Sequence, residues 1–266
     1  MSNYVNTCKK MTNYRFSQGG AIVFGGSGVL GSGIVDLLSK NNTNVAFTYL
    51  NNKESAEKNI NMMNDNGVNG FTEKVNLMNL SEVKNFSERA LKEFGKIHSV
   101  INATGPLIHL TPIVDAKLDD FYNTLDTDVI GFYHILKSVV PILKKCGGGS
   151  ITTLTTTAVH KYTHTAGLSS IPKTVVYNLC KTIAREEGHN GIRVNSVAVG
   201  QISIVSKKQQ EEIDSSDGVA DEFLKLIPLG RSGKPEELFE TVIFLASENA
   251  GYISGQSIPV DGGYSS

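Results

Sequence analysis

The sequence predicts an α/β fold in which a single doubly wound parallel sheet is covered by helices on both faces. From Ala21 onward, short runs rich in Val and Ile alternate with longer amphipathic segments. The short runs are apolar almost throughout, which is typical of parallel strands buried on both faces. A glycine-rich turn directly follows the first run. A chain of 266 residues fits one domain of this kind.

Periodicity places strands and helices in alternating order. Strands are predicted at Ala21–Phe24, Asn44–Tyr49, Gly70–Val75, Ser99–Asn102, Ser150–Leu154, Arg193–Ala198 and Ser257–Val260. Helices are predicted at Leu30–Lys40, Glu54–Asn64, Ser81–Phe94, Phe121–Lys144, Lys173–Glu187 and Pro235–Ser247. We assign residues 1–18 to an N-terminal extension and residues 19–266 to the domain.

The connection from residue 201 to residue 230 has no clear periodicity and is the most charged part of the chain. Connections of this length inside a compact domain are usually functional or disordered. We therefore predict a lid at about residues 201–230. A solvated surface excursion is the alternative.

Composition excludes several classes of protein. The chain is 40% hydrophobic and 19% charged, and its net charge of −1 gives no electrostatic footprint for nucleic acid or an acidic membrane. Three distant cysteines without metal-ligand spacing argue against disulfides and against a metal site. Neither a secretory leader nor a long apolar run is present, so we expect a cytoplasmic protein whose partners are small molecules or other subunits.

The turn after the first strand has the composition of a phosphate-binding loop. Glycines let the backbone turn sharply and approach a pyrophosphate, which then lies at the amino end of the following helix. A tight turn without a ligand is the alternative. The residues predicted to bind cofactor here are Gly25, Ser27, Gly28, Leu30 and Gly31.

The end of the second strand indicates which dinucleotide is bound. Asn51, Asn52 and Lys53 follow this strand, and no carboxylate occurs before Glu54. A carboxylate would hold the ribose diol of NADH and repel a 2′-phosphate, whereas amides and an ammonium can accept that phosphate. We therefore predict NADPH in preference to NADH. A polar start to the next helix is the alternative.

Several motifs resemble the short-chain dehydrogenase/reductase family, whose fold is Rossmann-like. Asn102-Ala103-Thr104-Gly105 is similar to its Asn-Asn-Ala-Gly turn, and Gly200-Gln201-Ile202-Ser203 stands where the family has its nicotinamide-contacting loop. The C-terminal third, from Pro228 to Gly263, matches the family closely. The resemblance implies that the cofactor also contacts Asn76, Leu77, Asn102, Ala103, Lys173, Gly200 and Ile202.

The family's catalytic positions are only partly kept. The lysine that holds the ribose corresponds to Lys173, but Ser169 stands four residues earlier, where the family has its tyrosine acid. The serine position holds Thr156, and the asparagine position holds Asp128. Carbonyl reduction needs a proton donor tunable toward neutrality, and an aliphatic hydroxyl cannot be brought into that range.

Three interpretations remain. In the first, the chain reduces an acyl thioester, and we expect reduction of a conjugated C=C bond in preference to reduction of a 3-oxo group. It is then similar to the 2,4-dienoyl-CoA reductases, a branch of this family without the usual tyrosine. That resemblance implies that Asp128 activates a water, Lys173 holds the ribose and Thr156 bonds the thioester oxygen.

In the second interpretation, the loop His160-Lys161-Tyr162-Thr163-His164 supplies a displaced acid. In the third, the chain is a non-catalytic subunit that binds cofactor or a partner of the same family. The family resemblance also implies an interface formed by the helices Phe121–Lys144 and Lys173–Glu187. We therefore expect a homodimer or homotetramer, or a pair with another family member, acting on a CoA or carrier-protein thioester.

Overall fold

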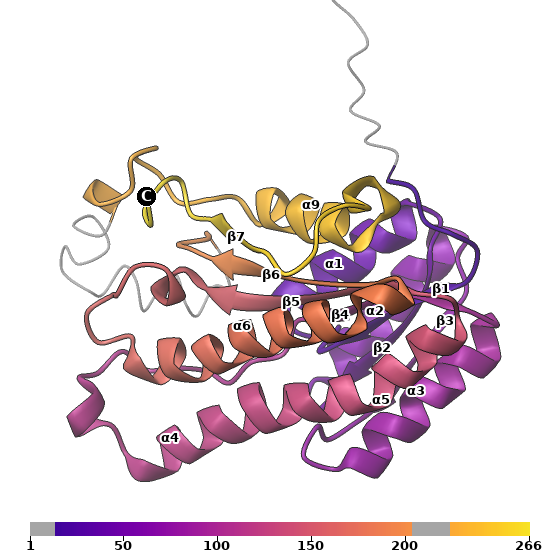
Figure 1. Ribbon diagram of the computed structural model, residues 1–266, viewed down its shortest axis with the longest axis horizontal. Helices are drawn as coiled ribbons and strands as arrows, with labels where there is room; N and C mark the ends of the chain where they lie inside the picture. Colours follow the sequence, from indigo (N-terminus) through magenta and orange to yellow (C-terminus); the bar gives the residue numbers. More distant parts are fainter. Residues whose placement is uncertain (1–13, 204–223) are drawn as a thin grey trace, which may run out of the picture.

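The computed structural model describes residues 14–203 and 224–266 and confirms the doubly wound parallel sheet (Figure 1). The strands run parallel in the order β3-β2-β1-β4-β5-β6-β7. Their bounds are β1 Gly20–Phe24, β2 Asn44–Tyr49, β3 Gly70–Lys74, β4 Ile97–Asn102, β5 Gly149–Thr156, β6 Ile192–Val199 and β7 Ser257–Val260. The order reverses between β1 and β4, which opens a crevice at their carboxyl ends.

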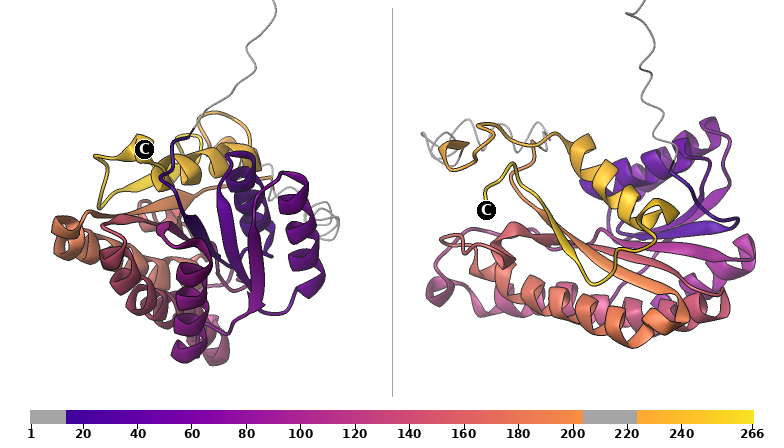
Figure 2. Two further views of the ribbon diagram at one scale, coloured as in Figure 1. Left: turned by 90° about the vertical axis from the view of Figure 1, so that its right-hand side faces the viewer. Right: turned by 45° about the horizontal axis from the view of Figure 1, so that its top comes forward.

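Two helical layers cover the sheet, as Figure 2 shows. The α-helices are α1 Val29–Lys40, α2 Lys53–Asp65, α3 Leu80–Phe94, α4 Leu118–Thr124, α5 Gly131–Lys145, α6 Gly167–Glu187 and α9 Pro235–Ala246. One buried apolar cluster joins α3, α5 and α6 to the sheet, and a second joins α1, α2 and α9 to its other face. No helix among the described residues is long and apolar enough to cross a membrane.

Short helical turns complete the chain. The 3-10 turns are η1 Ile113–Asp115, η3 Thr157–Val159, η4 Gly188–Asn190 and η5 Glu248–Ala250, and η2 Leu125–Ile130 is π-helical. The predicted lid falls largely on residues 204–223, which lie outside the described residues. Residues 14–18, which we assign to the extension, lie against the domain: Tyr14 and Phe16 contact the cluster under α1 and α9.

Two helix predictions need correction. The segment 121–144 is not one regular helix, because η2 separates α4 from α5. The helix that carries Lys173 begins at Gly167, ahead of Pro172. Proline costs this helix a backbone hydrogen bond but does not end it. Ser169 therefore lies on the same helix as Lys173.

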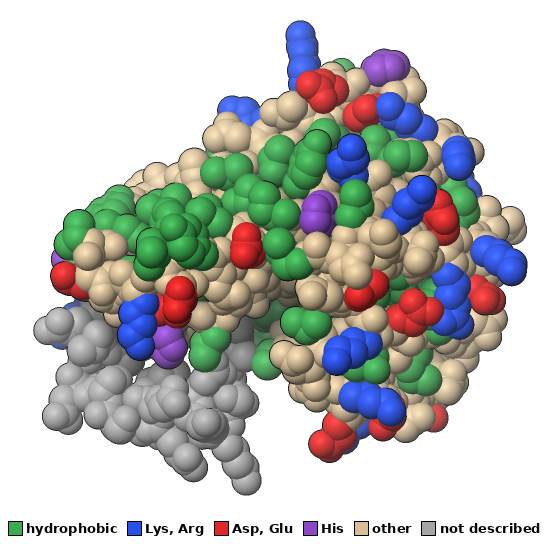
Figure 3. Space-filling model, turned by 90° about the horizontal axis from the view of Figure 1, so that it is seen from below, with side chains coloured by type: hydrophobic (Ala, Val, Ile, Leu, Met, Phe, Trp, Pro, Cys, Tyr) green, Lys and Arg blue, Asp and Glu red, His purple; other side chains and the backbone are tan. Residues whose placement is uncertain are grey.

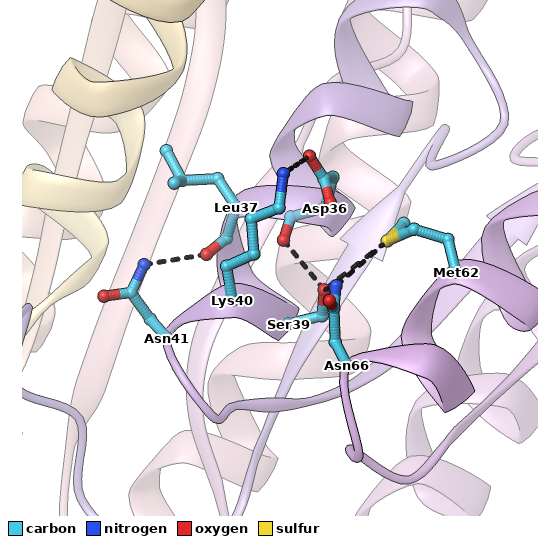
Figure 4. A network of polar contacts seen from close by, with 7 residues as sticks. All are labelled: Asp36, Leu37, Ser39, Lys40, Asn41, Met62 and Asn66. Atoms are coloured by element: carbon cyan, nitrogen blue, oxygen red, sulfur yellow. Dashed lines mark hydrogen bonds and ion pairs between the residues drawn. The ribbon is translucent and has the colours of Figure 1, made fainter.

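Side chains fasten α1 to α2 at both ends. At the carboxyl ends, the Asn66 amide donates to Ser39 Oγ at 2.7 Å, and Ser39 donates to the Asp36 carbonyl at 2.8 Å (Figure 4). At the amino ends, the buried Asn59 amide donates to the Gly26 carbonyl at 2.8 Å, and Ser55 Oγ donates to the Ser27 carbonyl at 3.0 Å. These bonds fix the glycine turn against α2.

Candidate active site

The turn between β1 and α1 requires glycine at two positions. Gly25 has φ of +79°, a conformation that L side chains rarely adopt. A Cβ at Gly25 would lie 2.8 Å from Thr104 Cγ2, and a Cβ at Gly31 would lie 2.1 Å from the Gly25 carbonyl oxygen. The strand, the turn and the first turn of α1 are therefore in close backbone contact.

The amino end of α1 has no side-chain cap. Gly28 occupies the N-cap position, and no acidic residue lies in the first turn. By contrast, Asn52 caps α2 and Asn79 caps α3. The first N–H groups of a helix lack partners within it, and together with the helix dipole they favour an anion. This end of α1 therefore fits a pyrophosphate.

A cleft of about 450 Å³ opens at the carboxyl ends of the first four strands. Eight of the residues predicted to bind cofactor line it: Gly25, Ser27, Gly28, Asn51, Asn52, Asn76, Leu77 and Ala103. The cleft is also lined by residues that we did not predict to bind cofactor, among them Thr48, Tyr49, Leu50, Ser55, Met78 and Gly105. Most of these follow or end a strand, and residues at the carboxyl ends of parallel strands face such a crevice. Strand position alone is thus a signal for them.

Three predicted cofactor residues lie beside the cleft. Gly31 is buried behind the glycine turn. Lys53 extends into solvent with 71% of its side chain exposed, and its Nζ lies 3.5 Å from Glu57. Asn102 is buried, and its amide donates to Thr153 Oγ1 at 3.1 Å. The Asn102 side chain therefore braces β4 against β5.

Two more predicted cofactor residues, Gly200 and Ile202, follow β6 at its carboxyl end. A Cβ at Gly200 would lie 2.5 Å from Asp261 Cβ, so that glycine allows a close chain crossing. Ile202 is buried and pairs with Gly233 in an isolated bridge. Neither is among the described residues that line the cleft or the groove that continues it.

The groove that continues the cleft has a volume of about 540 Å³. The two cavities share Gly28, Val29, Ala103, Thr104 and Gly105, so they form one continuous opening. The groove brings together the predicted residues Leu30, Thr156, Ser169 and Lys173. Thr156 ends β5, and its Oγ accepts a hydrogen bond from the Ala158 N–H at 3.3 Å.

A buried ion pair stands at the junction of the cleft and the groove. Lys173 Nζ lies 2.6 Å from Asp128 Oδ2, and both residues are buried. A Cβ at Gly105 would lie 3.6 Å from Lys173 Nζ and 3.7 Å from Asp128 Oδ1. Because Gly105 lines both cavities, the pair lies within reach of a ligand there. The predicted residues Asp128 and Lys173 are thus brought together.

Local structure explains how Asp128 reaches Lys173. Asp128 lies in the π-helical turn η2, and π-turns are frequent at functional sites because they redirect side chains. Burial raises the pKa of the Asp128 carboxyl, and this effect outweighs the opposing effect of the Lys173 ammonium. The pair can therefore hold a proton at a higher pH than an ordinary carboxylate.

Comparison with known proteins places this geometry in a family. Residues 26–265 match the family model described as Enoyl-(Acyl carrier protein) reductase. A Staphylococcus epidermidis 3-oxoacyl-(acyl-carrier-protein) reductase FabG is 32% identical over 243 residues, covering 91% of this chain and 97% of that protein. The chain belongs to the short-chain dehydrogenase/reductase family.

Other relatives vary in their named activity. A cyclohexanol dehydrogenase from an Acinetobacter species is 27% identical over 263 residues, which covers 97% of this chain and 99% of that protein. A short-chain dehydrogenase/reductase from Mycobacterium ulcerans has a TM-score of 0.87 at 25% identity, covering 94% and 91% of the two chains. The family's fold is therefore shared across different substrates, and chemistry has to be argued from the site.

The site of this short-chain dehydrogenase/reductase lacks a phenol in the groove. Ser169 occupies the family's usual tyrosine position, one helical turn before Lys173, and no tyrosine is among the described residues that line the groove. No residue of the 160–164 loop is among the described residues that line the groove. His160 Nε2 lies 2.9 Å from Ser257 Oγ, and Lys161 donates to the Tyr264 carbonyl at 2.8 Å. Tyr162 is 74% exposed.

The raised pKa of Asp128 predicts how stability depends on pH. A carboxyl with a raised pKa in the folded state contributes stability that is present below its unfolded pKa and is lost as pH rises through the folded value. A tenfold difference in proton affinity between the folded and unfolded states corresponds to about 1.4 kcal/mol. Asn does not titrate, so Asp128→Asn lacks this contribution. The free energy of unfolding of the wild type, measured by urea unfolding, should therefore fall relative to that of Asp128→Asn as the pH rises from 4 to 7.5.

The matched control is Asp126→Asn, because Asp126 lies exposed in the same turn. It removes a carboxyl from the same turn without removing the buried one, so a pH dependence that both variants share would not come from the buried pair. A wild type that gains stability relative to Asp128→Asn as pH rises would show instead that the ammonium lowers the Asp128 pKa.

Proposed function

We propose that the protein is an NADPH-dependent reductase of acyl thioesters. It reduces a conjugated C=C bond in preference to a 3-oxo group. The observation that carries this proposal is the Lys173–Asp128 pair at the junction of the two cavities, where no tyrosine is among the described residues that line the groove. The family model and the FabG relatives, whose names refer to acyl carrier protein, support a thioester substrate.

The cofactor fits the residues that are present. Its pyrophosphate would lie on the uncapped amino end of α1, beside Gly25 and Gly28, and Lys173 would hold the ribose next to the nicotinamide. When bound, NADPH supplies the hydride. The chain's own residues must then stabilise negative charge on the substrate and provide one proton.

Conjugate reduction makes demands that these residues can meet. Hydride addition at the β-carbon places negative charge on the thioester oxygen, and the proton goes to the α-carbon. Thr156 Oγ accepts the Ala158 N–H, which leaves its own proton to donate to that oxygen. Asp128 and Lys173 are placed to order a water and hold the proton for the α-carbon.

Carbonyl reduction fits less well. It requires a proton on oxygen from a group tunable toward neutral pH. The hydroxyls in the groove belong to threonine and serine, including Thr156 and Ser169, and their pKa values lie far above that range. This contrast supports our proposal that a C=C bond is reduced in preference to a 3-oxo group.

Turnover assays test the reaction. With NADPH, 2-enoyl or 2,4-dienoyl thioesters of CoA or carrier protein should be reduced faster than 3-oxoacyl thioesters, as followed by NADPH absorbance. Asp128→Asn should lower kcat by about 10²- to 10⁴-fold, while NADPH binding measured by fluorescence persists. Asp126→Asn should retain wild-type turnover.

Two outcomes would contradict this proposal. Faster reduction of 3-oxo groups would assign carbonyl chemistry. NADPH binding without turnover of any of these thioesters, alone or with co-expressed family members, would favour the non-catalytic subunit.

The preference for NADPH rests on the rim of the cleft. Asn51, Asn52 and Ser55 line it where the second strand ends, and no carboxylate is among the described lining residues. Lys53 is the first residue of α2, beside these side chains, and its ammonium lies 3.5 Å from Glu57. Exposed ion pairs of this kind contribute little free energy, so the Lys53 side chain can leave Glu57 and turn toward a 2′-phosphate.

Charge reversal at this rim tests the preference. Asn51→Asp places a carboxylate where a 2′-phosphate would lie, so the Kd for NADPH should rise at least about tenfold relative to that for NADH. Asn61→Asp makes the same charge change on an exposed position of α2 and should leave the ratio unchanged. Equal Kd values for both cofactors in the wild type would refute the preference.

We also propose that the chain forms a homodimer or homotetramer through α5 and α6. Apolar side chains stay exposed on this side, including Tyr133 at 48% and Val175 at 40%. Figure 3 shows hydrophobic side chains gathered on part of the face seen from below. Clustered exposed apolar side chains of this kind mark interaction surfaces.

Light scattering tests the assembly. The wild type should have the mass of a dimer or tetramer, and Tyr133→Asp combined with Val175→Asp should reduce it. Leu80→Asp, which changes an exposed apolar residue at the start of α3, should keep the wild-type mass. A monomeric wild type would contradict the proposal.

A further inference from the structure

The loop after β4 exposes apolar side chains beside the reacting groups. Residues 106–114 read Pro-Leu-Ile-His-Leu-Thr-Pro-Ile-Val and contain no Asp, Glu, Lys or Arg. Leu107 is 77% exposed and Leu110 is 70% exposed. A single exposed leucine is ordinary, but a run of them at the mouth of a cavity indicates a surface that an apolar ligand covers.

Only the first part of this loop faces the groove. Pro106, Leu107 and Ile108 line it together with Leu154 and Val199. Lys173 is the one charged side chain among the described lining residues, and its ammonium is paired with Asp128. Away from Lys173, the described lining residues therefore offer apolar contacts and no charged group that could pair with a charge on the ligand.

The loop is held in this position at both ends. Gly105 lies against the Lys173–Asp128 pair, and the Thr111 N–H donates to the Thr165 carbonyl at 3.1 Å. Thr165 has φ of +64°, which is rare for a β-branched residue and costs free energy. Such a conformation persists where the surrounding structure imposes it. Ile113 of the loop lies close to Gly167, where α6 begins, since a Cβ at Gly167 would lie 3.0 Å from Ile113 Cβ.

We propose that Pro106, Leu107 and Ile108 bind the acyl chain of the substrate and set a preference for uncharged chains longer than four carbons. This inference rests on the proposed function, because it assumes a thioester whose reacting carbons lie beside Lys173. The groove volume of about 540 Å³ falls in the range of small-molecule sites. The chain continues from the reacting carbons along the apolar wall.

A chain-length series tests the proposal. Among 2-enoyl-CoA substrates, kcat/KM should rise about three- to fourfold for each added methylene between C4 and C10. Leu107→Asp should lower the C10 to C4 ratio of kcat/KM at least tenfold. Leu107→Ala should lower the ratio less, in the same direction.

Leu110→Asp is the matched control. Leu110 is as exposed as Leu107 and lies in the same loop, but it is not among the described residues that line the groove. Its C10 to C4 ratio should change less than twofold. A flat series in the wild type, or equal effects of the two variants, would overturn the inference while leaving the reductase activity in place.

Binding of unreactive chains separates this inference from the proposed reaction. In calorimetry with NADP⁺ present, decanoyl-CoA should bind at least tenfold more tightly than butyryl-CoA, and Leu107→Asp should reduce that difference. This result without turnover of any thioester would refute the proposed reaction and support the acyl site. Equal binding of the two acyl-CoAs would overturn the acyl site.

Discussion

The buried contact between Lys173 and Asp128 is the constraint on which the site depends. Taking two charges out of water is costly, and loss of either partner from such a pair typically costs about 3–5 kcal/mol. The contact joins η2 to α6 and lies against the backbone at Gly105. Three separate segments of chain are therefore positioned around one ion pair, and the end of the cofactor cleft takes its shape from it.

The Lys173–Asp128 pair also suits a different reaction from the one that the family's usual tyrosine and lysine support. A phenol beside an ammonium gives a proton donor for oxygen, whereas a carboxylate beside an ammonium gives a charged site that orders water. The glycine turn and the uncapped amino end of α1, where we propose that the cofactor binds, are independent of this difference. Cofactor binding and proton supply thus reside in different parts of the chain, and one can change while the other is kept.

The sequence predicted the sheet well because strand signals are local. The bounds of β2 and β7 match the predicted ones, since each run of apolar residues is flanked by polar turns. The π-turn at Asp128 could not be predicted from local sequence signals. It occurs together with a contact to Lys173, a residue far away in the sequence. Asn102 was assigned to the cofactor from its motif, but its side chain turns inward to Thr153, a contact that only the pairing of β4 with β5 creates.

Specificity in this fold follows from what stands at the carboxyl edge of the sheet. Relatives that are 27% and 32% identical to this chain carry different activity names, and this chain differs from the family at that same edge. The interior constrains this loop only where the two meet, at Gly105 and at Thr111, whose N–H donates to the Thr165 carbonyl. Between those two points the chain is free to present polar or apolar side chains. Here it presents proline, leucine and isoleucine. Water is a poor partner for these side chains, so an apolar ligand gains more from this wall than a polar one does.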